Sequence, residues 1–293
     1  MIKKIAISLA LAAFVFNAAS FAADAPKRRV LFFSKSSGFE HSVIKVKDGQ
    51  PSYADKVLME LGAKNNIEFT CTKNGAVFTP EGLAQFDAVF FYTTGDLTQP
   101  GNDKQPPMPA NGKETLLNYI KSGNGFIGSH CATDTFHSKG GQVDPYIDMI
   151  GGEFLSHGAQ QKSKISCADA DFPGCRECRN GFELHEEWYS LKNIAKDLHV
   201  LLVQNTDGMT GWMYQRPAYP STWTKAYGKG RVFYTSMGHR EDVWTNPVFQ
   251  NMVVNGIKFA CRDISANTVP TVEKVTPEAW TVPTAPPKND KKK

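Results

Sequence analysis

Short apolar runs alternate with helical patterns through the first half of this 293-residue chain. A run that is apolar at nearly every position is typical of a strand buried on both faces. Between two of these runs, Ser52 can cap a helix, and 113–121 carries leucines at helical spacing. Alternating strands and helices predict a parallel sheet covered by helices on both faces. The predicted strands of this half are 29–34, 67–71, 86–94 and 125–129.

The second half of the chain contains more strand than helix. Gly228 to Gly230 separates two of its strands by a hairpin turn, which makes that pair antiparallel. A last helix is predicted over 248–261, where apolar residues recur at helical spacing. We therefore expect an α/β fold with a mainly parallel central sheet and extra antiparallel strands in its second half. Those strands are 164–167, 182–189, 199–203, 221–227 and 231–236.

The N-terminal residues 1–22 have the pattern of a secretory signal peptide. Lys3 and Lys4 give a basic start, an apolar run of about twelve residues follows from Ile5 to Phe16, and Ser20-Phe21-Ala22 offers a small-x-small cleavage site. The apolar run is too short to span a bilayer, and no other run approaches the required length. We expect a periplasmic or secreted protein with no membrane span after cleavage.

The remaining chain divides into a domain over 23–263 and a tail over 264–293. Five of the thirty tail residues are proline, and the tail ends in lysines, a composition typical of a disordered extension. The net charge is +4. Lys3, Lys4 and the tail account for that excess, which leaves the body about neutral and without the basic face that nucleic acid requires.

The cysteines indicate a disulfide, since an oxidising compartment favours paired thiols. Cys167, Cys175 and Cys178 lie within one Gly/Pro-punctuated loop, where we expect one bridge, with the third thiol pairing elsewhere. A redox CxxC at Cys175 and Cys178 and a four-Cys zinc site are weaker interpretations, because the flanking elements and a second pair are missing. The sequence leaves the pairing open among Cys71, Cys131, Cys167, Cys175, Cys178 and Cys261.

Polar residues follow four of the apolar strands. The carboxyl ends of parallel strands form the rim at which α/β folds bind their ligands, so we expect these side chains to converge in one crevice. The alternative is that they are turn and cap residues, which Ser, Thr, Gly and Asp favour. The candidates are His41, Thr94, Asp96, His130, Asp134 and His239.

The run His185 to Tyr189 is a second candidate feature. Neighbouring residues on a strand point to opposite faces, so only one of Glu186 and Glu187 is expected to face a pocket, with the other solvated. Trp188 and Tyr189 beside a carboxylate suit saccharide binding, because rings cover the apolar face of a sugar. The alternative places both aromatic side chains in the core.

These segments, in this order, resemble the ThuA-like (trehalose utilisation) family over about 29–261. The resemblance implies a flavodoxin-like fold of the class I glutamine amidotransferase-like superfamily, a three-layer sandwich, and a link to disaccharides or 3-keto sugars. The chain departs from the family pattern at Cys131, at Gly158 and in the 167–178 loop. The resemblance rests on 29–33, Gly38-Phe-Glu-His41, Phe90–Asp96, Gly123–His130, Ala132–Asp134, Gly151–Phe154, Ser156–His157, Glu187–Tyr189 and Gly230–His239.

The resemblance and the residue chemistry together define a predicted site. His130 and His239 are general acid/base candidates, since imidazole titrates near neutral pH, and Asp134 and Glu187 would orient them or hold hydroxyls. These four are the predicted catalytic residues for hydrolysis, isomerisation or elimination on a saccharide. The predicted substrate-binding residues are His41, Thr94, Asp96, His157, Trp188 and Tyr189.

Other functions stay open as alternatives. A periplasmic sugar-binding protein would keep the pocket without catalysis. A Cys131 amidotransferase is disfavoured, because the glycine-flanked nucleophile elbow is missing. The sequence calls for no cofactor. A metal ion is an alternative, because His41, His130, His157, His239 and Glu187 are suitable ligand types although no short-range motif joins them. The oligomeric state is left open.

Overall fold

The computed structural model describes residues 27–287, and the predicted signal peptide lies outside them. Nine strands form one sheet in the order β2-β1-β3-β4-β11-β10-β9-β6-β7. The first five are mutually parallel and the rest antiparallel. Their bounds are β1 Arg28–Phe33, β2 Ile67–Thr72, β3 Ala88–Phe91, β4 Gly125–Ser129, β11 Gly230–Thr235, β10 Tyr219–Tyr227, β9 His199–Gln204, β6 Gln161–Cys167 and β7 Phe182–Glu186. The predicted α/β class with a parallel half and an antiparallel half is confirmed.

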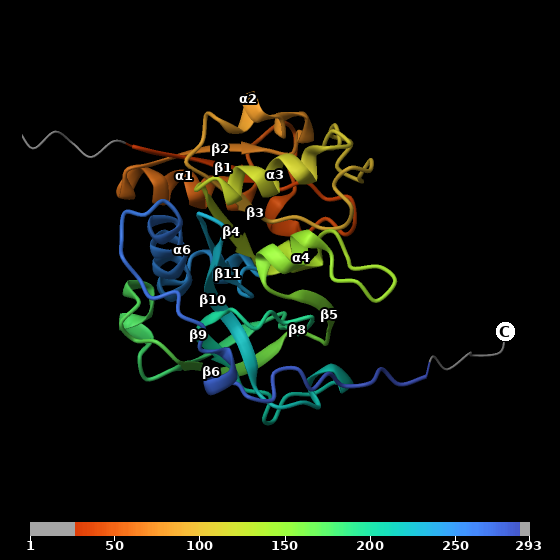
Figure 1. Cartoon of the computed structure of the whole chain (residues 1–293), viewed down its shortest axis with the longest axis vertical. Coiled ribbons are helices and arrows are strands. Elements are labelled where there is room, and N and C mark those ends of the chain that lie inside the picture. The colour runs from red at the N-terminus through yellow and green to blue at the C-terminus, as the bar shows by residue number, and fades with distance from the viewer. Residues whose placement is uncertain (1–26, 288–293) are drawn as a thin grey trace, which may run out of the picture.

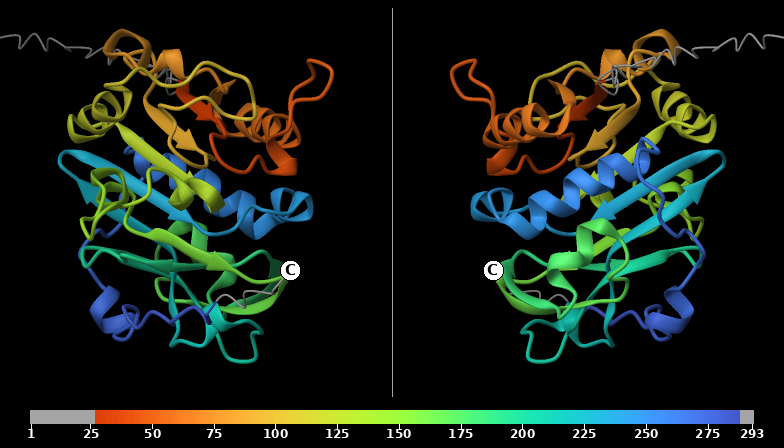
Figure 2. Two further views of the ribbon diagram at one scale, coloured as in Figure 1. Left: turned by 90° about the vertical axis from the view of Figure 1, so that its right-hand side faces the viewer. Right: turned by 90° about the vertical axis from the view of Figure 1, so that its left-hand side faces the viewer.

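Helices cover both faces of the parallel half, which gives three layers (Figures 1 and 2). α1 Tyr53–Asn65, α5 Glu241–Trp244 and α6 Pro247–Ala260 pack together on one face, and α2 Pro80–Leu83, α3 Gly112–Lys121 and α4 Pro145–Ile150 on the other. The 3-10 helices are η1 Ser42–Ile44, η2 Gly75–Val77, η3 His130–Asp134, η4 Pro173–Cys178 and η5 Trp212–Tyr214. None of the helices in the described range combines the length and apolar character needed to cross a bilayer.

Local sequence chemistry explains where these elements begin and turn. Ser52 caps α1 in a reciprocal capping box with Asp55, each side chain accepting the other's backbone N–H. Every residue of β3 and β4 is buried, as central strands between two helical layers require. Gly228 adopts a φ of +60° in the β10–β11 hairpin, a conformation that glycine takes without steric cost.

The predicted strand 182–189 is wrong in one respect that bears on the site. β7 ends at Glu186, and the chain leaves the large sheet at Glu187. It then forms β8 Tyr189–Lys192, which pairs with β5 Glu153–His157 in a separate two-stranded sheet. Glu187 therefore lies at a junction between two sheets rather than within a strand.

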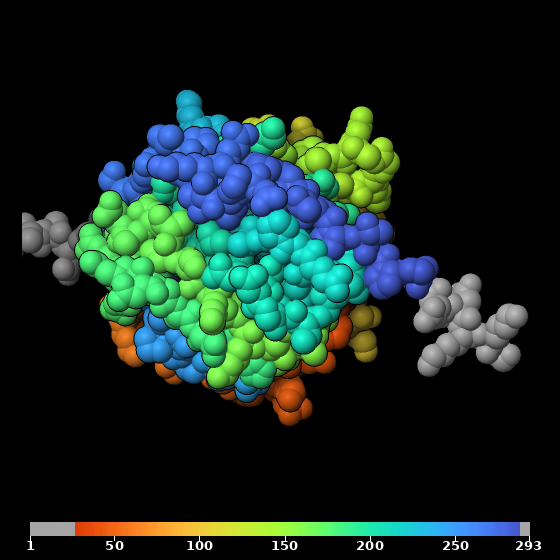
Figure 3. Space-filling view, turned by 90° about the horizontal axis from the view of Figure 1, so that it is seen from below, coloured from red at the N-terminus to blue at the C-terminus, as the bar shows by residue number. Residues whose placement is uncertain are grey.

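The predicted disorder of 264–293 is wrong for the part of the tail that the structure describes. The tail forms α7 Val272–Val275 and runs across the molecule (Figure 3). The indole N–H of Trp280 donates to Ile194 O at 2.8 Å, and the buried Arg216 guanidinium donates to Ala279 O. A few buried apolar side chains anchor a segment whose overall composition is typical of disorder.

The cysteines are free thiols in this structure, so the expected disulfide is not formed in it. The three thiols predicted to lie together do so. Cys175 is within hydrogen-bonding reach of both Cys167 and Cys178, on a segment that packs against α6.

Candidate functional site

Three imidazoles meet at the carboxyl ends of the parallel strands, as the strand-end pattern predicts. His41 follows β1, His130 follows β4 directly and His239 follows β11. His130 Nε2 lies 3.3 Å from His239 Nδ1, and the His41 ring centroid lies 5.0 Å from that of His130 and 5.2 Å from that of His239. Residues far apart in the chain are gathered here because parallel strands end on one rim.

His130 occupies a sharp strand-to-helix turn. Its φ is +46°, a left-handed conformation that is uncommon for a residue with a side chain and is found at functional sites. Its carbonyl accepts the Tyr234 hydroxyl at 2.8 Å, and its Nδ1 donates to Ser236 O at 3.1 Å. The turn therefore presents an imidazole where a nucleophile elbow would present a thiol or hydroxyl. Cys131 is buried, and burial raises the pKa of its thiol well above the usual value.

Glu187 lies at the centre of a cluster of four imidazole side chains, called here the imidazole group: His41, His130, His157 and His239. Its Oε2 lies 3.0 Å from His239 Nδ1 and 3.5 Å from His130 Nε2, and its Oε1 lies 3.2 Å from His157 Nδ1. Burial alone would raise the pKa of Glu187, but its contacts with the imidazoles of His130 and His239 outweigh burial and hold the pKa well below the usual range. The group therefore contains a carboxylate anion among imidazoles.

Burial divides these imidazoles into two kinds. His41 and His130 are buried, and desolvation lowers the pKa of each, so both are neutral near pH 7. The His239 side chain is 17% exposed and that of His157 43% exposed. Proton exchange with a bound molecule is therefore open to His239 and His157, on the solvent side of Glu187.

The second glutamate of the pair departs from expectation. Glu186, expected to be solvated if Glu187 faces a pocket, is fully buried. Its Oε2 accepts the backbone N–H groups of Gly238 and His239 at 2.8 and 3.1 Å, and its Oε1 accepts that of Glu187 at 2.8 Å. Burial raises the pKa of Glu186 to about 7 against the effect of these donors. Glu186 thus fixes the loop that carries His239.

Two predicted aromatic binding residues lie in different environments. Tyr189 belongs to the site: its ring centroid lies 4.2 Å from that of His130, and its hydroxyl lies 3.5 Å from His41 Nε2. Trp188 is fully buried, and its indole N–H donates to Gln161 O at 3.2 Å. Trp188 therefore lies in the core, as the alternative interpretation of this run expects. Its ring has no open face for a sugar.

Thr94 and Phe39 shape the loop before His41. The buried Thr94 hydroxyl donates to Phe39 O at 2.8 Å, so it holds that loop in place. Phe39 is 67% exposed, and its ring centroid lies 5.0 Å from that of His41. Sequence reasoning missed Phe39, although it lies inside the Gly38-Phe-Glu-His41 segment. An exposed ring beside buried polar groups is a surface on which a saccharide can stack.

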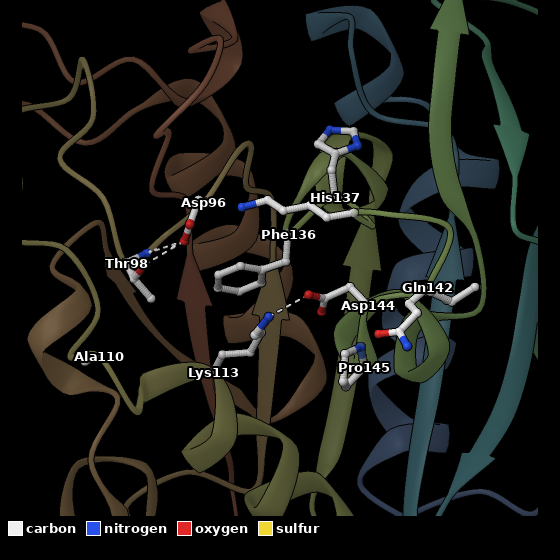
Figure 4. Close-up of a pocket in the computed structure, with 11 residues that line it drawn as sticks. Asp96, Thr98, Ala110, Lys113, Phe136, His137, Gln142, Asp144 and Pro145 are labelled. Atoms are coloured by element: carbon white, nitrogen blue, oxygen red, sulfur yellow. Dashed lines mark hydrogen bonds and ion pairs between the residues drawn. The ribbon is translucent and has the colours of Figure 1, made fainter.

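Asp134 and Asp96 lie apart from the imidazole group. Asp134 Oδ1 pairs with His137 Nε2 at 2.6 Å. Asp96 Oδ1 accepts the Thr98 backbone N–H and hydroxyl, and it lines a separate cavity of about 590 Å³ together with Phe136 and Lys113 (Figure 4). The Phe136 ring lies between Asp96 and Lys113 in that view. The structure therefore brings together His41, His130, His157, Glu187, Tyr189 and His239, and it leaves out Asp96, Asp134 and Trp188.

A cavity opens beside the imidazole group. It has a volume of about 590 Å³, and His239 forms part of its wall. The wall is mainly polar and charged, and the volume lies in the range of small-molecule sites. The other lining residues are Ser42, Tyr53, Gln160, Arg240, Glu241, Asp242 and Thr245.

The trehalose utilisation (ThuA) family matches residues 29–260. The chain belongs to the ThuA family. Similar solved structures include a ThuA-like protein from Bacteroides uniformis, with a TM-score of 0.62 and 17% identity, covering 81% of this chain and 93% of that one. A ThuA-like protein from Parabacteroides merdae has a TM-score of 0.58 and 15% identity, covering 84% and 94%. No curated protein matches the chain. At these identities the ThuA-like structures show the fold alone, and they confirm the flavodoxin-like three-layer arrangement.

Proposed function

We propose that this ThuA protein is a carbohydrate-processing enzyme that acts on a disaccharide or a 3-keto sugar by His/carboxylate acid–base chemistry. The observation that carries the proposal is the Glu187 carboxylate held between His130, His157 and His239 beside a cavity. Buried ionisable groups with strongly shifted pKa values are typical of catalytic sites. The family's description supports the substrate class.

The burial of each group assigns its role in the proposed chemistry. His157 and His239 reach solvent, so they are the groups that exchange a proton with a hydroxyl or an acidic C–H of the substrate. Glu187 orients both rings and stabilises the charge that forms when one of them gains a proton. His130 and Tyr189 form the floor of the site, and Phe39 offers the stacking surface.

The test is a screen of the mature protein against disaccharides and their 3-keto forms, with products identified by mass spectrometry. His239→Ala and Glu187→Gln are expected to lower turnover by at least about a hundredfold, the usual scale for lost acid–base groups. His185→Ala is the matched control, because this exposed histidine lies on β7 next to Glu186 but outside the site. Full turnover in both site variants would refute the proposal.

A non-catalytic sugar-binding protein is the competing outcome of the same screen. Calorimetric binding of a disaccharide with no product from any sugar tested would favour it and would remove the acid–base roles. Phe39 and the cavity wall would still bind the sugar in that case.

We further propose that the protein works in the periplasm or is secreted. The support is the signal-peptide pattern of residues 1–22. Cell fractionation followed by intact-mass measurement tests it, and the expected product lacks the residues up to Ala22. Recovery of the uncleaved chain from the cytoplasm would contradict this location.

A further inference from the structure

Three donor atoms at the centre of the site have the mutual spacing of ligands around one ion. Glu187 Oε2, His239 Nδ1 and His130 Nε2 are separated by 3.0, 3.3 and 3.5 Å. Ligand atoms of one tetrahedral zinc ion lie about 3.3–3.4 Å apart when the bonds are about 2.0–2.1 Å long. His41 adds a fourth ligating side chain, and all four donor atoms lie within 4.8 Å of one another.

The hydrogen-bond pattern leaves a lone pair aimed at the centre of this group. The carbonyl of Ser236 can only accept, so His130 Nδ1 carries the proton and Nε2 of the neutral ring carries a lone pair. That lone pair faces the Glu187 carboxylate, which also only accepts. A proton on His239 Nδ1 can make one good hydrogen bond, either to Glu187 Oε2 or to His130 Nε2. A cation at this point would satisfy both.

His41 gives a second, independent observation. It is buried, and its Nδ1 has no hydrogen-bond partner. Its ring lies edge-on to the rings of both His130 and His239. A buried ring nitrogen without a partner is costly, so its retention beside three other ligating groups points to a ligand.

Supporting contacts of the kind that orient metal ligands are also in place. The Ser236 carbonyl fixes the ring orientation of His130, and His157 holds the second carboxylate oxygen of Glu187. Glu186 fixes the backbone of His239 through two N–H groups. The site is therefore organised before any ion arrives, and His239 connects it to the open cavity.

We propose that His41, His130, Glu187 and His239 form a binding site for one divalent transition-metal ion of the kind that prefers imidazole. Three nitrogens and one carboxylate favour zinc-type ions over magnesium or calcium, which prefer all-oxygen sites. The ion would polarise a substrate oxygen. With His239 holding the ion, proton transfer would fall to His157, which lies outside the four ligands. The inference uses the same centre as the proposed function, but it does not depend on a saccharide.

The test is a titration of Zn²⁺ into the full-length mature protein without a histidine tag, after chelator treatment and dialysis. One equivalent of Zn²⁺ per chain is expected, with no comparable binding of Mg²⁺. Glu187→Gln and His130→Asn are expected to weaken Zn²⁺ binding by more than about a hundredfold. Removing a residue that only supports a metal ligand has a smaller effect. His185→Ala, a histidine outside the group, is expected to bind as the parent does.

Co²⁺ substitution gives a second measurement that does not require the variants to fold. The parent protein is expected to show the visible absorption of a four-coordinate Co²⁺ site, and Zn²⁺ is expected to displace it. Absence of stoichiometric Zn²⁺ uptake, or equal uptake by Glu187→Gln and His185→Ala, would overturn the metal site. Either result leaves the saccharide screen unaffected, and a failed screen leaves the metal measurement unaffected, so the two proposals can fail separately.

Discussion

Glu186 and Gly238 illustrate how single residues fix the position of a reactive group. Gly238 has a φ of +126°, its N–H donates to Glu186, and its carbonyl accepts the Tyr92 hydroxyl at 3.0 Å and the Trp244 indole N–H at 2.7 Å. A residue with a Cβ would be strained at this φ and would meet Ser129 Oγ at 2.7 Å. The backbone beside His239 is therefore held from both sides.

Replacing Glu186 tests this role. Glu186→Ala leaves three N–H groups, one of them buried and two part-buried, without their acceptor, so we expect a loss of about 2–3 kcal/mol of unfolding free energy. Turnover is also expected to fall, because His239 loses its fixed backbone. Urea denaturation measures the stability. Glu183→Ala, exposed on the same strand and paired with Lys162, is the control and is expected to change stability by less than about 1 kcal/mol. Equal losses in both variants would contradict the positioning role.

Phe39 offers a test of saccharide binding that leaves the fold intact. Its ring is 67% exposed, so Phe39→Ala is expected to change stability little. Stacking is worth about 0.5–1.5 kcal/mol, so we expect Kd or KM for the saccharide to rise about two- to tenfold. Val269→Ala removes a side chain of similar exposure in the tail and serves as control. An unchanged Kd for Phe39→Ala would show that sugar binds elsewhere.

At the scale of elements, the η4 segment carries a testable disulfide. Contact with the Cys175 thiol of η4 lowers the pKa of Cys167, at the end of β6, to about 7. This shift favours the nucleophilic thiolate at Cys167. Under oxidising conditions we expect Cys175 to bridge to Cys167 or Cys178, because its thiol interacts with both of theirs. Closing so short a loop is expected to stabilise the fold by about 2–3 kcal/mol.

Mass spectrometry with alkylation before and after reduction measures this bridge. In Cys175→Ser, both Cys167 and Cys178 should alkylate without reduction. Cys261 is the internal control, since burial raises the pKa of its thiol to about 12 and no cysteine partner contacts it among the described residues. A bridge that survives Cys175→Ser would show that the loop pairs differently.

The elements also show what the sequence alone can predict. Periodicity locates the parallel strands and α6, because each buries an unbroken apolar face, and strand order then brings His41, His130 and His239 together. The break after Glu186 has no local signal, because Trp188 and Tyr189 continue the pattern of a strand. The same holds for the tail, where Trp280 packs against the core and its indole N–H donates to Ile194 O. Both depend on tertiary contacts between distant segments.

At the scale of the whole molecule, charged side chains join the two-stranded sheet to the η3 segment that follows β4. Glu153 on β5 is buried and accepts from His137 Nδ1 at 3.1 Å, from Lys192 on β8 at 3.2 Å and from Asn193 at 2.7 Å. His137 continues to Asp134 at the end of η3, the helix that starts with His130. The network therefore ties the sheet that carries His157 and Tyr189 to the segment that carries His130.

This network predicts a pH dependence of stability. A hydrogen bond with Asp134 raises the pKa of His137; burial opposes this shift, and contacts with Glu153 add to it. The contribution of His137 to the unfolding free energy is therefore complete below its unfolded pKa of about 6.5. It is lost as pH rises through the higher folded pKa. Burial opposes ionisation of Glu153, but hydrogen bonds from Ser138, Asn193, His137 and Lys192 lower its pKa to about 2. Its contribution is present above the unfolded value of about 4.3 and is lost as pH falls toward 2.

The two contributions overlap between about pH 4.3 and 6.5, where the network is fully charged. We therefore expect the unfolding free energy of the parent to exceed that of His137→Gln by the largest amount near pH 5.5, and by less at pH 9. Because the His137 side chain is 41% exposed, solvent screening keeps that excess below about 1 kcal/mol. Urea midpoints of both proteins across this pH range measure it, and His185→Gln is the control that should show no such maximum. A difference between parent and His137→Gln that grows above pH 7 would mean that His137 joins β5 to the η3 segment as a neutral ring, through geometry rather than charge.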